Sequence, residues 1–242
     1  MTLNQQIDSW LSAHKSTHQR SLTSVRRPFI TLCYAQSWDG SITTRSDAAL
    51  SLSGEEATQL THQLRSLHDG ILVGIGTVLT DDPQLTVRQW PGPNPQPIVL
   101  DSHLRMPLTA RLCRHSDKRC WILTSLRDDN KFGKQADIIT LDGDAEGRVK
   151  LQDALTLLWE KGIRMLMVEG GGNVITAFLK ACLADALVLT VAPTLIGGYK
   201  AVGDLGITHK NQLPRIQPLH SERLGNDLII WGDLQYQEQR EP

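Results

Sequence analysis

The stretch 71–88, ILVGIGTVLTDDPQLTVR, restricts the fold of this chain more than any other segment. Its first residues are β-branched and uncharged, which is typical of a short strand covered on both faces of a parallel sheet. Gly74 and Gly76 follow, and a residue without a Cβ lets a ligand approach the main chain. A hydroxyl, a carboxylate and a cation come next, at Thr77, Asp81 and Arg88. This order indicates a nucleotide or phosphate site; the alternative is a plain strand followed by a proline-containing turn.

Two further apolar runs, 98–100 and 120–124, have the same character, and each ends in small hydroxyl or acidic residues. Because the carboxyl ends of parallel strands meet at one edge of a sheet, we expect a ligand site along that edge. The sequence therefore predicts an α/β domain, with helical segments between the strands.

A third apolar run, 165–168, enters the sequence Glu169-Gly170-Gly171-Gly172-Asn173. Apolar residues at helical spacing follow from Val174 onward. A strand, a glycine turn and a helix start form an anion site, because unpaired N–H groups point outward from a helix N-terminus. The alternative is a tight turn that holds no ligand.

The segment before residue 70 predicts a helix in which Leu60, Leu64 and Leu67 share one face. We expect Ser53 to be its N-cap, with Glu56 three residues on. This helix brings Arg65 close to the following strand, where Arg65 and Arg88 could clamp one anion. A solvated arginine is the alternative.

Composition excludes several classes of function. The 242 residues are 40% hydrophobic with a formal net charge of −1, and no basic face for nucleic acid is apparent. No apolar run reaches the length of a membrane helix, and no secretory signal is recognised. The cysteines form no C-x-x-C pair and the histidines have no ligand spacing, so we expect no metal site and a cytoplasmic location.

The ends of the chain differ from its centre. We interpret residues 1–27 as an arm with a short amphipathic helix, and residues 28–236 as one domain. Segments 216–224 and 228–231 predict an antiparallel hairpin around Gly225-Asn226-Asp227. The fold class expected is a mixed, mostly parallel central sheet with helices on both faces and this C-terminal hairpin.

Several motifs, in order, resemble the reductase domain of riboflavin biosynthesis, the RibD C-terminal-like family. The resemblance covers about residues 28–231, and its most specific part is the T-V-L-x-D-D-P-x-L-T-V-R block. The motifs are AQSWDG at 35–40, HDGILVG at 68–74, TVLTDDPQLTVR at 77–88, VLDS at 99–102, VEGGG at 168–172 and AP-x-x-IGG at 192–198.

The resemblance implies a dihydrofolate-reductase-like fold, a homodimer, and NADPH-dependent reduction of the ribosyl side chain of a phosphorylated ribosylaminopyrimidine to ribityl. Many bacterial relatives also carry a zinc deaminase domain with a P-C-x-x-C signature. That signature is absent from this sequence, so we expect a stand-alone reductase.

The resemblance also assigns roles to residues. Asp81 would lie near the carbon that accepts the hydride, as an orienting group or proton relay. The substrate-binding positions implied are Arg65, Leu85, Arg88 and Glu169, with the two arginines on the substrate phosphate. The cofactor-binding positions implied are Gln36, Thr77, Asp81, Ser102, Gly171, Gly172, Asn173 and Val174.

The chain departs from the family pattern at Cys33, where many relatives have lysine, and at Ala49 and Ser51. These departures leave two alternatives open: a dihydrofolate-reductase-like enzyme for another pteridine or carbonyl substrate, and a non-catalytic nucleotide-binding module. The sequence does not decide between the deaminated and the aminated pyrimidine. Ser125 and Arg127 are candidates for a 2′-phosphate contact that would select NADPH over NADH.

Overall fold

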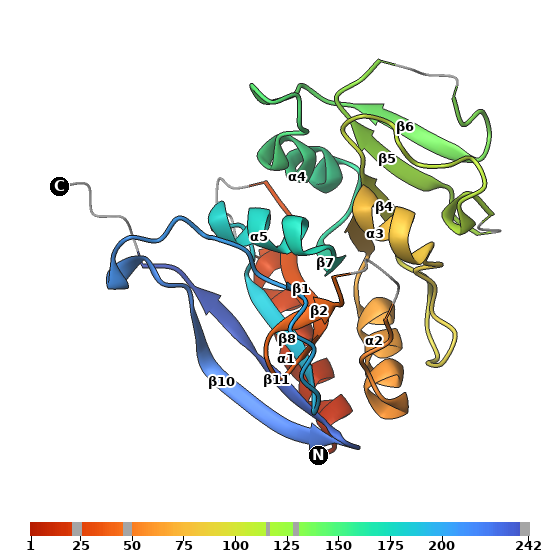
Figure 1. The fold of residues 1–242 in the computed structure, drawn as a ribbon. Helices are drawn as coiled ribbons and strands as arrows, with labels where there is room; N and C mark the ends of the chain where they lie inside the picture. Colours follow the sequence, from red (N-terminus) through yellow and green to blue (C-terminus); the bar gives the residue numbers. More distant parts are fainter. Residues whose placement is uncertain (21–25, 46–49, 115–116, 128–130, 238–242) are drawn as a thin grey trace.

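A computed structural model describes residues 1–20, 26–45, 50–114, 117–127 and 131–237. Its centre is a nine-stranded sheet in the order β10-β11-β8-β1-β7-β3-β4-β5-β6 (Figure 1). The strands are β1 (Phe29–Ser37), β3 (Gly70–Gly74), β4 (Gln96–Leu100), β5 (Cys120–Thr124), β6 (Ala136–Thr140), β7 (Met165–Gly170), β8 (Ala186–Ala192), β10 (Arg215–Leu224) and β11 (Asp227–Gln235).

The sheet is parallel from β8 through β1 to β6, and the C-terminal hairpin β10–β11 adds to β8 in antiparallel orientation. The predicted mixed, mostly parallel sheet and hairpin are confirmed. A separate small sheet pairs β2 (Ser41–Thr43) with β9 (Tyr199–Lys200), which the sequence did not predict.

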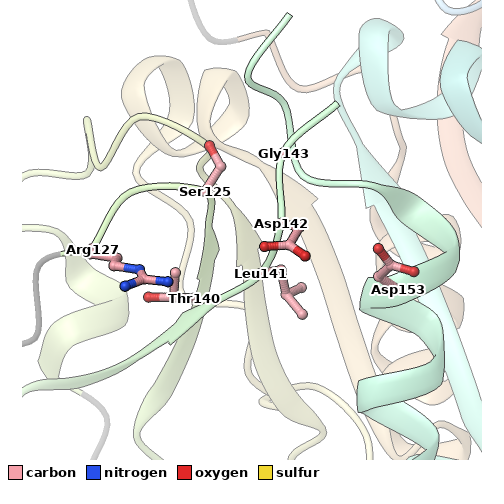
Figure 2. Close-up of a pocket in the computed structure, with 7 residues that line it drawn as sticks. All are labelled: Ser125, Arg127, Thr140, Leu141, Asp142, Gly143 and Asp153. Carbon is pink, nitrogen blue, oxygen red and sulfur yellow. The ribbon is translucent and has the colours of Figure 1, made fainter. Parts of the chain in front are cut away.

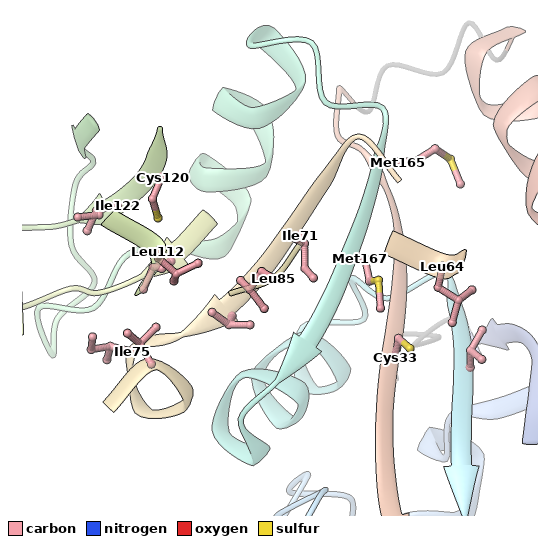
Figure 3. Packing of buried hydrophobic residues seen from close by; sticks show 14 of the residues in the cluster. Cys33, Leu64, Ile71, Ile75, Leu85, Leu112, Cys120, Ile122, Met165 and Met167 are labelled. Carbon is pink, nitrogen blue, oxygen red and sulfur yellow. The ribbon is translucent and has the colours of Figure 1, made fainter. Parts of the chain in front are cut away.

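Helices cover both faces of the sheet, as expected, and they bury two apolar clusters. Figure 3 shows part of the first cluster. Alternate strand residues point to opposite faces, so Ile71 belongs to one cluster and its neighbour Leu72 to the other. The first cluster lies under α1 (Leu3–Arg20) and α2 (Glu55–Leu67), and the second under α4 (Leu151–Glu160) and α5 (Gly172–Lys180).

The N-terminal helix differs from the expected short element. It spans 18 residues and continues through the polar run that follows Leu11. Its residues Leu3, Ile7 and Leu11 are at most 3% exposed and belong to the first cluster. Tertiary packing of three apolar side chains stabilises a helix whose later residues are polar, so this helix is part of the core.

One local prediction is wrong, and one short helix was not predicted. Helix α2 begins at Glu55 with Gly54 as N-cap, and within the described residues no side chain caps it, so Ser53 is not the cap. The segment after β3 is a short helix, α3 (Ile75–Asp81), and Gly76 lies inside it. A helix of seven residues, with glycines at 74 and 76 beside its first residue, gives too little periodicity to predict from the sequence.

The last strand of the chain does not lie at an edge of the sheet. Strand β11 lies between β8 and β10, and its residues Ile229 and Trp231 are buried. The edge strand is β10, whose burial pattern is almost entirely exposed. The chain therefore covers its apolar last strand with a polar one.

Asp39 connects two motifs that are far apart in the sequence, 35–40 and 192–198. One carboxylate oxygen accepts hydrogen bonds from the Ser37 hydroxyl and the Ile196 N–H, at 2.6 and 2.9 Å. The other accepts from the Ser41 hydroxyl, the Gly197 N–H and the Lys200 ammonium group, at 2.7, 3.0 and 2.8 Å. The Lys200 contact and these hydrogen bonds hold the pKa of Asp39 far below its usual value. The motifs at 35–40 and 192–198 therefore hold one another in place beside the small sheet.

Within the described residues, no helix is long and apolar enough to cross a membrane. In the same part of the chain, no group of three or more histidine, cysteine or acidic side chains is placed to hold a metal ion.

Candidate functional site

A cavity of about 430 Å³ opens toward the carboxyl ends of β1, β3 and β7. Its walls come from β1, β2, β7 and β8, from the segment 50–53, and from helices α2, α3 and α5. The lining residues predicted from the sequence are Arg65, Thr77, Asp81, Arg88, Glu169 and Gly171. The structure therefore brings half of the predicted catalytic, substrate-binding and cofactor-binding residues to one place, at the sheet edge where a ligand was expected.

Helix α2 divides its faces between the core and the cavity. Leu60 and Leu64 are 1% exposed and pack into the first cluster. The polar residues one or two positions away line the cavity instead; they are Thr58, Thr61, His62 and Arg65. The 3.6-residue period of one helix thus supplies both the core contact and one polar wall.

Arg65 and Glu169 form an ion pair inside this cavity. Nε of Arg65 donates to Oε2 of Glu169 at 2.8 Å, and Nη2 donates to Oε1. The third contact of the guanidinium is from Nη1 to the backbone oxygen of Thr86, at 3.0 Å. Arg65 is 8% exposed; burial lowers its pKa, but the charge and hydrogen bonds of Glu169 outweigh burial and keep the pKa raised. Arg65 is therefore a charged group with three of its five N–H donors in hydrogen bonds to the protein.

Arg88 shares the cavity but is less constrained. Its Nη1 donates to the Thr86 hydroxyl at 2.6 Å, in an exposed contact. Burial lowers the pKa of Arg88, and the positive charges of Arg65 and Arg111 lower it further. Two arginines and one paired carboxylate leave a surplus of positive charge near Arg88. The predicted clamp is thus unequal, because Arg65 already binds Glu169.

Helix α3 carries Thr77 and Asp81 on the cavity wall. The side chain of Asp81 is exposed, yet nearby protein raises the pKa of its carboxyl by desolvation. Gly76 also lines this wall, and within the described residues no atom lies within 4 Å of the point where its Cβ would be. The main chain at Gly76 is consequently open to a ligand.

The glycine turn after β7 packs closely against other segments. Gly171 is the N-cap of α5 with a φ of 80°, a conformation that favours glycine. A Cβ on Gly172 would lie 2.9 Å from the backbone oxygen of Lys200. A Cβ on Gly74 would lie 2.6 Å from the Val174 side chain. The glycines at 74 and 172 are thus required by packing, and a bulky residue at Gly172 would disturb the fold.

A second cavity, of about 480 Å³, lies beyond β4 at the ends of β5 and β6. Ser125, Arg127, Thr140, Asp142 and Asp153 line it, with Arg127 beside Thr140 and Asp153 on the opposite side (Figure 2). Ser102 lies next to it, since its backbone oxygen accepts from the Ser125 hydroxyl at 2.9 Å and its own hydroxyl accepts from the Val149 N–H at 3.0 Å. Ser102 thus lies beside the second cavity, at the end of the strand next to β3.

Some predicted residues lie away from the first cavity. Leu85 is 1% exposed and belongs to the core cluster, with a φ of 55°. Gln36 lies on β1 opposite Val191, outside the lining residues. Asn173 and Val174 begin helix α5 outside the lining set as well. Ala49 falls outside the described residues, whereas Ser51 lines the cavity.

Cys33 lies inside the cavity wall, 6% exposed. Burial raises the pKa of its thiol, and the nearby Glu169 carboxylate raises it further, while Arg65 opposes both. A neutral thiol therefore lines this wall in place of the lysine that the family resemblance led us to expect.

His62 is the main site residue that the sequence analysis missed. It lines the cavity while being 2% exposed, and it accepts a hydrogen bond from the Arg88 backbone N–H at 3.1 Å. Its position three residues before Arg65 places both on one helix face. That spacing was the signal that could have identified it.

This chain is similar in sequence and in fold to known proteins. The family model described as the RibD C-terminal domain matches residues 28–230. The 2,5-diamino-6-ribosylamino-4(3H)-pyrimidinone 5′-phosphate reductase of Archaeoglobus fulgidus is 37% identical over 182 residues, covering 71% of this chain and 83% of that protein. The riboflavin biosynthesis protein RibD of Aquifex aeolicus is 34% identical over 209 residues, covering 85% of this chain and 57% of that protein. The chain thus spans little more than half the length of that relative.

A solved riboflavin biosynthesis reductase of Saccharomyces cerevisiae superposes with a TM-score of 0.74 at 25% identity, covering 95% of this chain and 99% of that one. RibD of Acinetobacter baumannii superposes with a TM-score of 0.76 at 24% identity, covering 88% of this chain and 59% of that one. The predicted dihydrofolate-reductase-like α/β fold is confirmed by these neighbours. The match over residues 28–230, together with a relative 37% identical over most of its own length, shows that the chain belongs to the RibD C-terminal domain family.

Proposed function

We propose that this chain is an NADPH-dependent oxidoreductase that reduces the ribosyl side chain of a 5′-phosphorylated ribosylaminopyrimidine to the ribityl form. The observation that carries the proposal is the cavity in which Arg65, Arg88, Asp81 and Glu169 meet beside the glycine turn at 170–172. Relatives at 33% to 37% identity are named as reductases of such a pyrimidine phosphate, which supports the same assignment.

The cofactor fits the carboxyl edge of the sheet. The first cavity, Ser102 and the second cavity follow one another along this edge, across β7, β3, β4 and β5. Such a row suits an extended dinucleotide, and the open backbone at Gly76 and the helix start at Gly171 suit its phosphates. Thr77 would contact the central part of the bound dinucleotide. Ser125 and Arg127 would contact the 2′-phosphate, although Asp142 and Asp153 in the same cavity oppose a dianion.

When bound, the nicotinamide would supply a hydride to the C1 carbon of the opened ribosyl group. In the ring-opened form C1 is double-bonded to the amine nitrogen, and this nitrogen takes up one proton as the hydride reaches C1. Asp81, whose pKa is raised by desolvation, can keep a proton at higher pH than a free aspartate and is placed on the cavity wall for that step. The rest of the cavity orients the substrate. Arg65 holds Glu169 in position, and Arg88 faces the substrate phosphate.

The test is a steady-state assay of NADPH oxidation with the aminated and the deaminated pyrimidine phosphate, each also in dephosphorylated form. We expect turnover of one phosphorylated compound, with NADPH favoured over NADH. Dihydrofolate and simple aldehydes serve as controls for the alternative that the cavity takes another carbonyl or pteridine substrate. Failure of every pyrimidine phosphate would contradict the proposal.

A further inference from the structure

Arg88 lines the cavity from the segment 86–88, which belongs to no helix or strand. Side chains from elsewhere hold its backbone. Asn94 Oδ1 accepts from the Val87 N–H at 2.7 Å, and Arg65 donates to the Thr86 oxygen at 3.0 Å. The position of Arg88 in the cavity therefore depends on these side chains.

His62 supplies the contact at Arg88 itself. The Arg88 backbone N–H donates to Nδ1 of His62 at 3.1 Å. His62 and Arg65 lie on the same face of α2, so one helix holds both ends of the segment 86–88. This arrangement ties the arginine of the loop to the helix that carries the ion pair.

The surroundings require a neutral ring at this place. Burial lowers the pKa of His62, and the charges of Arg65 and Arg88 lower it further, while Glu169 and the Thr86 backbone act in the opposite sense. A neutral imidazole can present an unprotonated nitrogen as acceptor. A lysine or arginine here would add a third cation and could not accept the N–H.

We propose that His62 is a positioning residue that holds the backbone of Arg88 so that its guanidinium faces the phosphate group of the ligand. The inference rests on the proposed function, because it takes Arg88 as the phosphate contact. His62 acts through Arg88 and does not itself touch the reacting carbon. Without the hydrogen bond from Arg88 to His62, the segment 86–88 is less restrained. Ligand binding must then order this segment, which lowers the affinity.

Two substitutions that each introduce a side-chain amide at position 62 test the proposal. His62→Asn can place its amide oxygen near the position of Nδ1, whereas the acceptor of His62→Gln lies one carbon farther out. We expect His62→Gln, and the apolar His62→Leu, to raise KM for the phosphorylated pyrimidine about threefold to tenfold, the size of one lost hydrogen bond. His62→Asn should retain most of the wild-type KM, and kcat and KM for NADPH should change little in all of them.

A purely structural role gives a different pattern. It would lower the melting temperature and the active fraction, reduce turnover equally for phosphorylated and dephosphorylated substrate, and show no recovery in His62→Asn. That result would overturn the proposal. So would equal KM values in His62→Asn and His62→Gln, a comparison that stands even where His62→Leu does not fold.

Ribose 5-phosphate binding separates this inference from the proposed function. If calorimetry shows that wild type binds it, that His62→Gln binds it threefold to tenfold more weakly, and that no pyrimidine is reduced, the positioning role stands and the proposed reaction fails. If reduction proceeds and His62→Gln keeps the wild-type KM, the positioning role fails alone. A chain that neither binds ribose 5-phosphate nor reduces the pyrimidine overturns both.

Discussion

Arg65 on helix α2 and Glu169 at the end of β7 form a two-point ion pair across 104 residues of sequence. The pair joins the helix to the centre of the sheet at the cavity wall. Because Arg65 also donates to the Thr86 oxygen, its planar fork uses three donors in fixed directions. The pair therefore has a structural as well as an electrostatic role.

Arg65→Lys tests that fork. Lysine keeps the charge but cannot reach both carboxylate oxygens and the Thr86 oxygen together. We expect the variant to lose about 1 to 3 kcal/mol of unfolding free energy in urea titrations, because buried polar partners are left unpaired. Arg148→Lys is the matched control, since Arg148 forms its contacts with Asp144 and Glu146 at the surface. Equal stability of the two variants would contradict a structural role for the pair.

Arg88→Ala tests the phosphate assignment. Removing one charge-assisted contact should lower kcat/KM for the phosphorylated substrate by about tenfold to a few hundredfold, at roughly 1.4 kcal/mol per tenfold. Affinity for NADPH should change little. Arg223→Ala, an exposed residue on β10, is the control. If Arg88→Ala loses NADPH binding and keeps its preference for the phosphorylated substrate, Arg88 belongs to the cofactor site.

Gly76→Val tests the cofactor placement better than a change at Gly172. The new side chain would enter open space on the cavity wall, whereas a side chain at Gly172 meets the Lys200 backbone. We expect NADPH affinity, measured by fluorescence titration, to fall at least tenfold, with the melting temperature close to wild type. Ala13→Val, on the exposed side of α1, controls for a branched residue in a helix. Unchanged affinity in Gly76→Val would move the cofactor away from this wall.

His68 predicts how stability depends on pH. It is 4% exposed, with Nδ1 donating to the Leu64 oxygen and Nε2 accepting from the Thr31 hydroxyl. Burial lowers its pKa from 6.5 to about 4. Because the unfolded chain binds the proton more readily, the contribution to stability is complete above about pH 6.5 and is lost as pH falls toward 4, by at most about 3 kcal/mol.

Urea titrations at a series of pH values measure this effect. The variant His68→Gln should be less stable at neutral pH and should show a flatter loss of stability between about pH 6.5 and 4.5. His103→Gln, at an exposed position, should follow the wild-type slope. Parallel slopes for wild type and His68→Gln would show that other groups cause the acid sensitivity.

We also expect a homodimer. The edge strand β10 is exposed along most of its length, and Leu219 on it is 58% exposed. An unprotected edge strand can pair with a second copy. Sedimentation at micromolar concentration should show a dimer that Leu219→Glu weakens. A monomeric wild type would contradict this expectation.

The sequence by itself determined the strands of the central sheet and the longer helices, although not α3 or the small sheet, and it indicated the sheet edge at which the first cavity opens. Uncharged branched runs such as Ile71-Leu72-Val73 identify parallel strands, and the glycines after them identify the turns. The T-V-L-x-D-D-P-x-L-T-V-R block identified the family, because a particular residue is defined at nearly every position of the block. Each of these signals lies within one segment of the sequence, so it can be recognised without knowing how the segments pack together.

The tertiary structure alone decided which side chains face one another. Arg65 was expected to bind a substrate phosphate, yet it is engaged by Glu169, which lies far away in the sequence. Leu85 was expected in the site, but it is buried in the core, and Gly172 is required by the Lys200 backbone. The physical reason is that a pairing between distant segments depends on strand register and on how each helix is rotated against the sheet. Neither quantity is contained in the periodicity of a single segment.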